Sequence, residues 1–304
     1  MASGGFEPLF KEHDSKQRIT LSQLDKVNNP KSIHGIYPYR GKMSAIDASH
    51  IISQLPSNAT LLDPFCGTGT IVYEAQAHGM TTIGVDNNPL ACIIARGKTE
   101  TIDQTSILST LTEAIYHARR IKKVPTMLDS ASCFFHPATA EQIMRMVAVS
   151  ADFPPYLLAT LYGSICVAAR ACNGWLWTST SIGRINKPLR NIDFYSTVTR
   201  KVRKHIGFIN SGKPAAIHTH DTRHIHEVVP ENSVDIVYTS PPYFDALDYT
   251  GYYSKIVIEI LGLDRNSIRE GLIQRFSTYR NDMQSALASI NRVVHDKSLI
   301  IFIV

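Results

Sequence analysis

Short apolar runs alternate with stretches of helical periodicity along much of this chain. Residues 59–62, 81–85 and 234–238 are apolar runs of strand length, each followed by a polar or turn-forming residue. A helical stretch at 71–77 separates the first two runs, and another periodic segment ends at Leu55. Strands that alternate with helices predict an α/β protein.

The turn after the first apolar run, DPFCGTGT at 63–70, has the composition of a ligand-binding turn. Gly67 and Gly69 let the backbone turn tightly and approach a ligand closely. The next strand ends in Asp86, which is placed to accept hydrogen bonds from ribose hydroxyls. The turn is neither G-x-G-x-x-G nor a phosphate loop. Asp63 would repel phosphate and favour a cationic tail, so the predicted ligand is S-adenosylmethionine.

The apolar run at 234–238 leads into a second motif, TSPPY at 239–243. Two consecutive prolines cannot continue a sheet ladder, because neither has an N–H to donate. They predict a stiff loop at the carboxyl edge of the sheet, where open α/β sheets bind ligands. A hydroxyl and an aromatic ring on such a loop suit an enzyme that holds a flat polar group.

Together the two motifs resemble those of the amino-methyltransferases of DNA, the cytosine-N4 and adenine-N6 group. The segment 34–43 resembles the part of that family that closes over the methionine end of the cofactor, and 217–223 resembles a short strand and acid that hold its adenine. The resemblance covers roughly residues 30–98 and 214–304, and implies a Rossmann-like methyltransferase sheet. The cofactor-binding residues that it implies are Asp63, Phe65, Gly67, Gly69, Asp86, Asn87, Asp221 and Lys42.

The chemistry of the TSPPY loop follows from the weakness of an exocyclic base amine as a nucleophile. Hydrogen bonds accepted from both amine hydrogens favour the tetrahedral nitrogen that attacks a methyl group. We expect the Ser240 hydroxyl and the Pro241 carbonyl to accept them, while Tyr243 stacks on the base. The predicted catalytic residues are Ser240, Pro241, Pro242 and Tyr243. A base within a duplex must be flipped out to reach such a loop.

The residue before the two prolines carries the target preference in this family. Ser there accompanies cytosine-N4 more often than adenine-N6, so Ser240 favours cytosine. Carbon-5 methylation is disfavoured, because no Pro-Cys pair supplies a thiolate. Two alternatives stay open: a base methyltransferase acting on RNA of the tRNA type, and an inactive subunit that binds S-adenosylmethionine and recognises nucleic acid.

A helical insertion at about 99–213 separates the two matching regions. Its periodic segments are 107–121, 138–149 and 156–170, and it is the candidate for target recognition. It contains a basic strip with only one opposing acid, which predicts contact with DNA phosphates. The residues of this strip are Arg184, Lys187, Arg190, Arg200, Lys201, Arg203 and Lys204.

We therefore expect four regions, namely an arm at 1–30, a cofactor-binding half at 31–98, the insertion, and a catalytic half at 214–304. A net charge of +5 permits nucleic-acid binding without requiring it, and five unpatterned cysteines indicate a reducing, cytoplasmic compartment. No membrane span is expected, because the uncharged stretch 153–169 contains prolines and fits a buried helix. No ligand spacing predicts a metal site.

The last apolar run, 298–304, predicts a fifth strand. Methyltransferase sheets of this type carry two further strands, so we expect either a second polypeptide or a further C-terminal segment to complete the sheet. An apolar central strand left at an open edge would otherwise promote aggregation.

Overall fold

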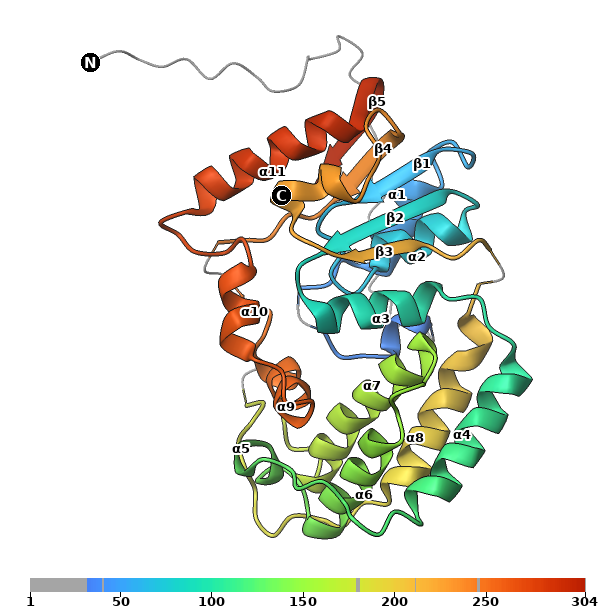
Figure 1. Ribbon diagram of the computed structural model, residues 1–304, viewed down its shortest axis with the longest axis vertical. Coiled ribbons are helices and arrows are strands. Elements are labelled where there is room, and N and C mark those ends of the chain that lie inside the picture. The colour runs from blue at the N-terminus through green and yellow to red at the C-terminus, as the bar shows by residue number, and fades with distance from the viewer. Residues whose placement is uncertain (1–31, 40, 179–180, 211, 245–246, 304) are drawn as a thin grey trace.

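The computed structural model describes residues 32–303 apart from 40, 179–180, 211 and 245–246. The expected N-terminal arm at 1–30 and the last residue, Val304, lie outside the described residues. Figure 1 shows two parts, a sheet with its helices in the upper half and a layer of helices in the lower half.

The upper part is a parallel sheet of five described strands in the order β3-β2-β1-β4-β5. The prediction of an α/β protein with a Rossmann-like parallel sheet is thus confirmed. The turn and the TSPPY loop follow neighbouring strands, since Leu61 and Leu62 of β1 pair with Ile236 and Val237 of β4. The strands are β1 (Thr60–Asp63), β2 (Thr81–Asp86), β3 (Ala216–Thr219), β4 (Val234–Thr239) and β5 (Val294–Phe302).

Alternate side chains of each strand point to opposite faces of the sheet. Leu61 packs with helices α1 and α2 on one face, while Leu62 packs with η3 and α11 on the other. Both side chains are fully buried, as expected of a parallel sheet covered on both sides. The covering elements are α1 (Ala45–Ile52), α2 (Thr70–Ala77), η3 (Thr222–Glu227) and α11 (Tyr279–Val293).

The lower part confirms the helical character expected of the insertion. Three of its helices match the periodic segments, and α8 carries part of the basic strip. Helix α3 joins this layer to the sheet, because it contacts both β3 and α7. The helices are α3 (Pro89–Thr99), α4 (Gln104–Ala118), α5 (Asp129–Ser132), α6 (Pro137–Ala148), α7 (Pro155–Cys172) and α8 (Phe194–His205), with the 3-10 turns η1 (Ile33–Gly35) and η2 (Ile206–Phe208).

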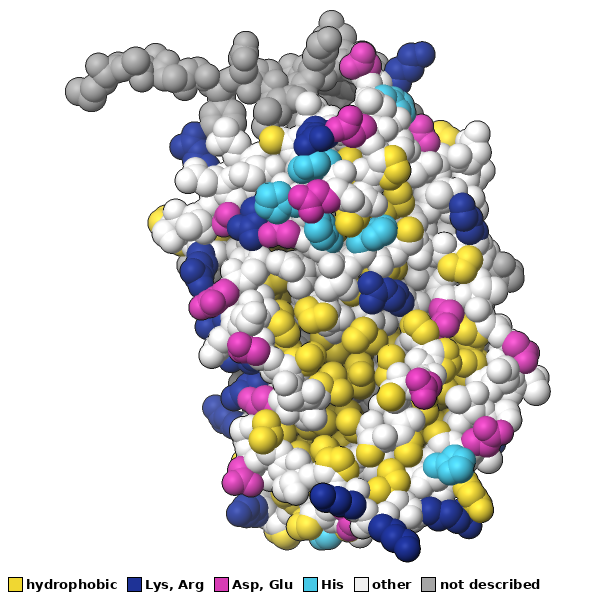
Figure 2. Space-filling view, in the orientation of Figure 1, with side chains coloured by type: hydrophobic (Ala, Val, Ile, Leu, Met, Phe, Trp, Pro, Cys, Tyr) yellow, Lys and Arg dark blue, Asp and Glu magenta, His cyan; other side chains and the backbone are white. Residues whose placement is uncertain are grey.

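Helix α7 is the centre of the helical layer. Among the described residues it is the one helix long and apolar enough to cross a membrane, yet most of its surface is buried inside the protein. A core helix of a soluble protein has the same composition. On the face shown in Figure 2, hydrophobic side chains gather over the helical layer and charged side chains surround them.

The core of the helical layer extends beyond the insertion itself. Ile33 and Ile36 from the N-terminal side and Tyr253 from the C-terminal side belong to the same buried cluster as Leu161 of α7. Helices α9 (Tyr252–Ile260) and α10 (Arg265–Gly271) lead from this cluster back towards the sheet (Figure 1). The boundaries at 99 and 213 therefore stay a prediction.

The fifth strand differs in two respects from the expectation. It begins at Val294, directly after α11, rather than at Ser298. It is also only partly covered: Ile300 and Ile301 pack on opposite faces, but Leu299 is 41% exposed. Within the described part of the chain it pairs with β4 alone. A partner chain or segment at this edge stays a prediction.

Candidate active site

Two cavities meet at the carboxyl edge of the central strands. The larger encloses about 700 Å³ and the smaller about 340 Å³, each including space open to solvent. Ser240 borders both cavities, and so do Phe65 and Gly67 of the first motif. The structure thus brings the two sequence motifs together around one continuous space.

The buried carboxyl group of Asp63 connects the two motifs directly. Its Oδ1 accepts hydrogen bonds from the Thr239 hydroxyl at 2.6 Å and from the Phe65 N–H at 3.2 Å. Burial raises the pKa of Asp63 to about 7, although both hydrogen bonds oppose that shift. Asp63 borders the smaller cavity. Because its pKa is close to neutral, a charged group that enters this cavity can change its protonation state.

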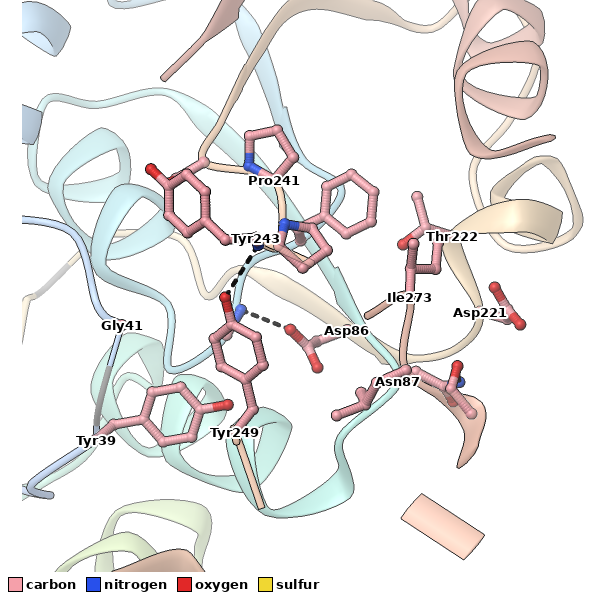
Figure 3. A pocket seen from close by; sticks show the side chains of 16 residues that line it. Tyr39, Gly41, Asp86, Asn87, Asp221, Thr222, Pro241, Tyr243, Tyr249 and Ile273 are labelled. Atoms are coloured by element: carbon pink, nitrogen blue, oxygen red, sulfur yellow. Dashed lines mark hydrogen bonds between the residues drawn. The ribbon is translucent and has the colours of Figure 1, made fainter. Parts of the chain in front are cut away.

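Asp86 is oriented by two backbone amides at the end of β2. Gly67 N–H donates to Oδ2 at 2.8 Å (Figure 3). Asn88 N–H donates to Oδ1, also at 2.8 Å. Burial raises the pKa of Asp86, and the two N–H donors oppose the shift. Its carboxylate borders the larger cavity with lone pairs still able to accept hydrogen bonds. Asn87 also borders this cavity, and its amide donates to the Gly271 carbonyl at 2.9 Å.

The two glycines of the first motif serve different purposes. Gly67, at φ +49°, borders both cavities, and a Cβ there would meet only the Tyr39 ring, at 3.8 Å. The backbone is therefore open to a ligand at this point, as S-adenosylmethionine requires. Gly69, at φ +71°, borders neither cavity, and a Cβ there would lie 2.8 Å from the Ala95 Cβ. Its position indicates packing against α3, and its expected ligand contact stays a prediction.

The TSPPY loop borders the larger cavity along its whole length from Ser240 to Tyr243. Tyrosines hold it from two sides. Tyr279 donates its hydroxyl proton to the Pro242 carbonyl at 2.7 Å. The Tyr243 N–H donates to the Tyr249 hydroxyl at 3.4 Å (Figure 3). Tyr243 itself is 43% exposed, so its ring is accessible from outside the cavity.

Lys42 borders the smaller cavity and donates to the His34 carbonyl at 2.9 Å. A second lysine, Lys98, is buried close to His34. Lys98, 1% exposed, donates to the Thr68 hydroxyl at 3.3 Å, and its Nζ lies 3.5 Å from His34 Nδ1. His34 Nε2 pairs with Glu74 at 2.7 Å, and burial lowers the pKa of His34 to about 4. These contacts of Lys98, His34 and Glu74 stabilise the turn of the first motif at Thr68.

Asp221 borders the larger cavity, but its carboxylate is already engaged. It accepts from both Nε and Nη2 of Arg223, at 3.0 and 2.6 Å, and Arg223 also pairs with Asp282 at 2.7 Å. Arg223 thereby holds the pKa of Asp221 below its usual value, against the effect of burial. In Figure 3 Asp221 lies across the site from Tyr39. Its predicted cofactor contact stays a prediction.

The basic strip does not form a single row. Arg200 and Arg203 border one hollow on the surface, whereas Lys201 and Lys204 border another. Burial lowers the pKa of Lys201 to about 8, and its Nζ donates to the Gly35 carbonyl at 3.1 Å. The second hollow also contains Lys42, so it adjoins the smaller cavity. Arg184, Lys187 and Arg190 lie exposed on the segment before α8.

Several residues of the site carry no strong signal in the sequence. The larger cavity is also bordered by Tyr39, Thr222, Tyr249, Leu272 and Ile273. In the sequence, only the cluster of aromatic residues after the TSPPY motif indicates that Tyr249 belongs to the site. Leu272 and Ile273 reach the site only because α10 ends beside Asn87.

Comparison with known proteins confirms the methyltransferase class that the two motifs predict. Residues 41–272 match the family described as D12 class N6 adenine-specific DNA methyltransferase. The type II methyltransferase M.MjaII of Methanocaldococcus jannaschii is 27% identical over 106 residues, which cover 34% of this chain and 20% of that protein. The type II methyltransferase M.MvaI of Kocuria varians is 33% identical over 66 residues, 22% of this chain and 14% of that protein. The match thus spans a fifth or less of either relative.

We expect the affinity for S-adenosylmethionine to rise with pH through Asp63. The pKa of this group is about 7 without ligand, and a nearby cation favours its ionised form. Binding should therefore release a proton below pH 7, with affinity roughly tenfold lower at pH 6 than at pH 8. Calorimetry in buffers of different ionisation enthalpy measures both effects.

Asp63→Asn is the matched control, because it preserves the shape and removes the titration. Its affinity should lack the part of the pH dependence that Asp63 supplies, while the titrations of the ligand and of Asp86 remain in both proteins. Identical pH profiles for the two proteins would contradict the role of Asp63.

Proposed function

Because this chain belongs to the D12 class N6 adenine-specific DNA methyltransferase family, we propose that it transfers a methyl group from S-adenosylmethionine to an exocyclic amine of a DNA base. S-adenosylmethionine is the methyl donor of this family, and supplies an electrophilic methyl group on a sulfonium. The observation that carries the proposal is the position of Ser240, which borders both the cavity of the first motif and that of the TSPPY loop.

The first motif, together with Asp86 and Lys42, fits the two ends of the cofactor. Asp86 accepts the ribose hydroxyls in this proposal, since two amides already fix its orientation. The open backbone at Gly67 admits the ligand, and Phe65 supplies apolar contact beside it. Asp63 offers a carboxylate near the smaller cavity, where Lys42 is also available for the amino-acid end.

The TSPPY loop holds the base amine. The Ser240 hydroxyl and the Pro241 carbonyl accept its two hydrogens, which favours the nitrogen geometry that attacks. Tyr243 stacks on the base, and hydrogen bonds from Tyr279 to Pro242 and from Tyr243 to Tyr249 keep the loop stiff. No covalent bond to the protein is required, so positioning supplies most of the catalytic effect. The target base is flipped out of the duplex to reach the loop.

Adenine N6 is the first candidate for the target, because the description of the family names it. Cytosine N4 is the second, and the observation that favours it is Ser240 before the two prolines. Both bases present an amine beside a ring nitrogen acceptor, so the same loop can serve either. The preference for cytosine stays a prediction. A place in a restriction–modification system and in the cytoplasm accords with this activity and with the five free cysteines.

The test is methyl transfer from tritiated S-adenosylmethionine to DNA and to RNA. Digestion of the methylated DNA to nucleosides and mass analysis then distinguish N6-methyl-2′-deoxyadenosine from N4-methyl-2′-deoxycytidine. Label in RNA alone would support the tRNA-type alternative. S-adenosylmethionine binding without any transfer would support an inactive recognition subunit.

Tyr243→Ala should abolish most methyl transfer while leaving the cofactor affinity nearly unchanged. The exposed ring is available to the base, and the cofactor contacts come from other residues. A loss of roughly 1–3 kcal/mol in base stacking corresponds to about fivefold to 150-fold in rate. Tyr243→Phe, which keeps the ring, is the control and should retain most activity. Near-normal transfer by Tyr243→Ala would refute the stacking role.

Two surface hollows carry cationic side chains of α8. We expect the hollow of Lys201 and Lys204, which adjoins the smaller cavity, to contact DNA phosphates more closely than the hollow of Arg200 and Arg203. Lys204→Glu should weaken DNA binding and flatten the dependence of log affinity on log salt by about one unit for each phosphate that is no longer neutralised. The double change Arg200→Glu and Arg203→Glu should have a smaller effect per charge. Titrations at several salt concentrations compare the two. Unchanged slopes in both variants would assign the strip to a solvated surface.

A further inference from the structure

Two phenylalanines stand exposed beside the catalytic loop without bordering the cavity. Phe276 is 73% exposed, the most exposed large hydrophobic side chain among the described residues, and Phe244 is 50% exposed. Neither belongs to the lining of the larger cavity, although Tyr243, the neighbour of Phe244, does. The pair therefore lies outside the cavity, on the solvent side of the loop that holds the base.

The two rings belong to a row of aromatic contacts that is anchored to the site. The ring centroids of Phe244 and Phe276 are 5.6 Å apart, and those of Phe244 and Tyr279 are 5.3 Å apart. Tyr279 in turn donates to the Pro242 carbonyl at 2.7 Å. Phe276 is thus connected to the base-binding loop through Phe244 and Tyr279.

The backbone around Phe276 is also well held. It lies in the short turn between α10 and α11, where the Thr278 and Tyr279 N–H groups donate to the Arg275 carbonyl at 3.1 and 2.8 Å. The start of the same turn, Leu272 and Ile273, forms part of the cavity wall. One turn therefore contributes both to the cavity and to the exposed ring beside it.

An exposed phenyl ring makes no hydrogen bond to phosphate, so ordinary contact with the DNA backbone does not explain it. Extruding a base leaves a gap in the stack, and apolar side chains fill or open such gaps between base steps. A flipped base in the cavity would place that gap beside the loop. Resting on the proposed function, we propose that Phe276, supported by Phe244, is a wedge that enters the duplex at the position of the extruded base.

The experiment compares two duplexes that contain the methylation site mapped with the unaltered protein. In one the target base is normally paired, and in the other it faces an abasic site, so that extrusion is easier. Single-turnover methyl transfer is measured for the unaltered protein and for Phe276→Ala. On the paired duplex we expect Phe276→Ala to lose on the order of tenfold to hundredfold in rate, because unstacking is no longer compensated. On the abasic duplex the loss should shrink to about threefold or less.

Two further variants control the comparison. Phe276→Leu keeps an apolar side chain that can enter a stack, and should retain most of the rate on the paired duplex. Tyr116→Ala removes an aromatic ring that is 53% exposed on α4, across the molecule from the α10–α11 turn in Figure 1, and should behave as the unaltered protein. The fluorescence of 2-aminopurine at the target position should fall in Phe276→Ala complexes on the paired duplex.

The outcomes separate the wedge from the proposed function. An equal loss on both duplexes, or no loss on the paired one, overturns the wedge while methyl transfer by the unaltered protein still supports the function. A change in association state of Phe276→Ala by sedimentation, with normal transfer, would instead assign the ring to a protein contact. Failure of the unaltered protein to methylate any DNA when the site is mapped would overturn both.

Discussion

The hydrogen bond between Asp63 and Thr239 is the contact on which the arrangement of this site depends. It joins residues 176 positions apart in the chain, at the carboxyl ends of two neighbouring strands. A carboxyl group that is 2% exposed is costly unless hydrogen bonds compensate for lost water. Thr239 and the Phe65 N–H supply them, so the turn of the first motif and the TSPPY loop are held at one separation. Burial still raises the pKa of Asp63 to about 7, which leaves the group responsive to a nearby cation.

Around this contact the polar groups are arranged in pairs that keep the turn rigid. Asp86 fixes the turn from the side of β2 by accepting the Gly67 N–H, and Lys98 supports it from below through Thr68. Lys98 lies in a buried environment that lowers its pKa, close to a His34 whose pKa is lowered as well. Lys98 and His34 are buried and stabilise the turn, whereas Asp86 both fixes the turn and borders the larger cavity.

The part of the chain that returns from the helical layer to the sheet forms one wall of the larger cavity. Helices α9 and α10 share contacts with this layer and then return to the sheet, where the Gly271 carbonyl accepts from the Asn87 amide. That return brings Leu272 and Ile273 to the cavity and leaves Phe276 exposed beside it. The same layer directs the cationic side chains of α8 into two separate hollows, because successive residues of a helix point in different directions.

The sequence alone determined the strands, the two motifs and their meeting at one edge of a parallel sheet. Apolar runs of strand length and turn residues at fixed places are local features, and parallel strands present their carboxyl ends together. Asp63, Asp86 and the TSPPY residues could be predicted for that reason. Tertiary structure decided what depends on partners distant in the sequence. Asp282 pairs with the Arg223 that binds Asp221, the Ala95 Cβ packs against Gly69, and the Gly35 carbonyl accepts from Lys201. It also decided the place of Tyr249, Tyr279 and Phe276, since an aromatic residue in a loop carries no local signal of the surface that it will face.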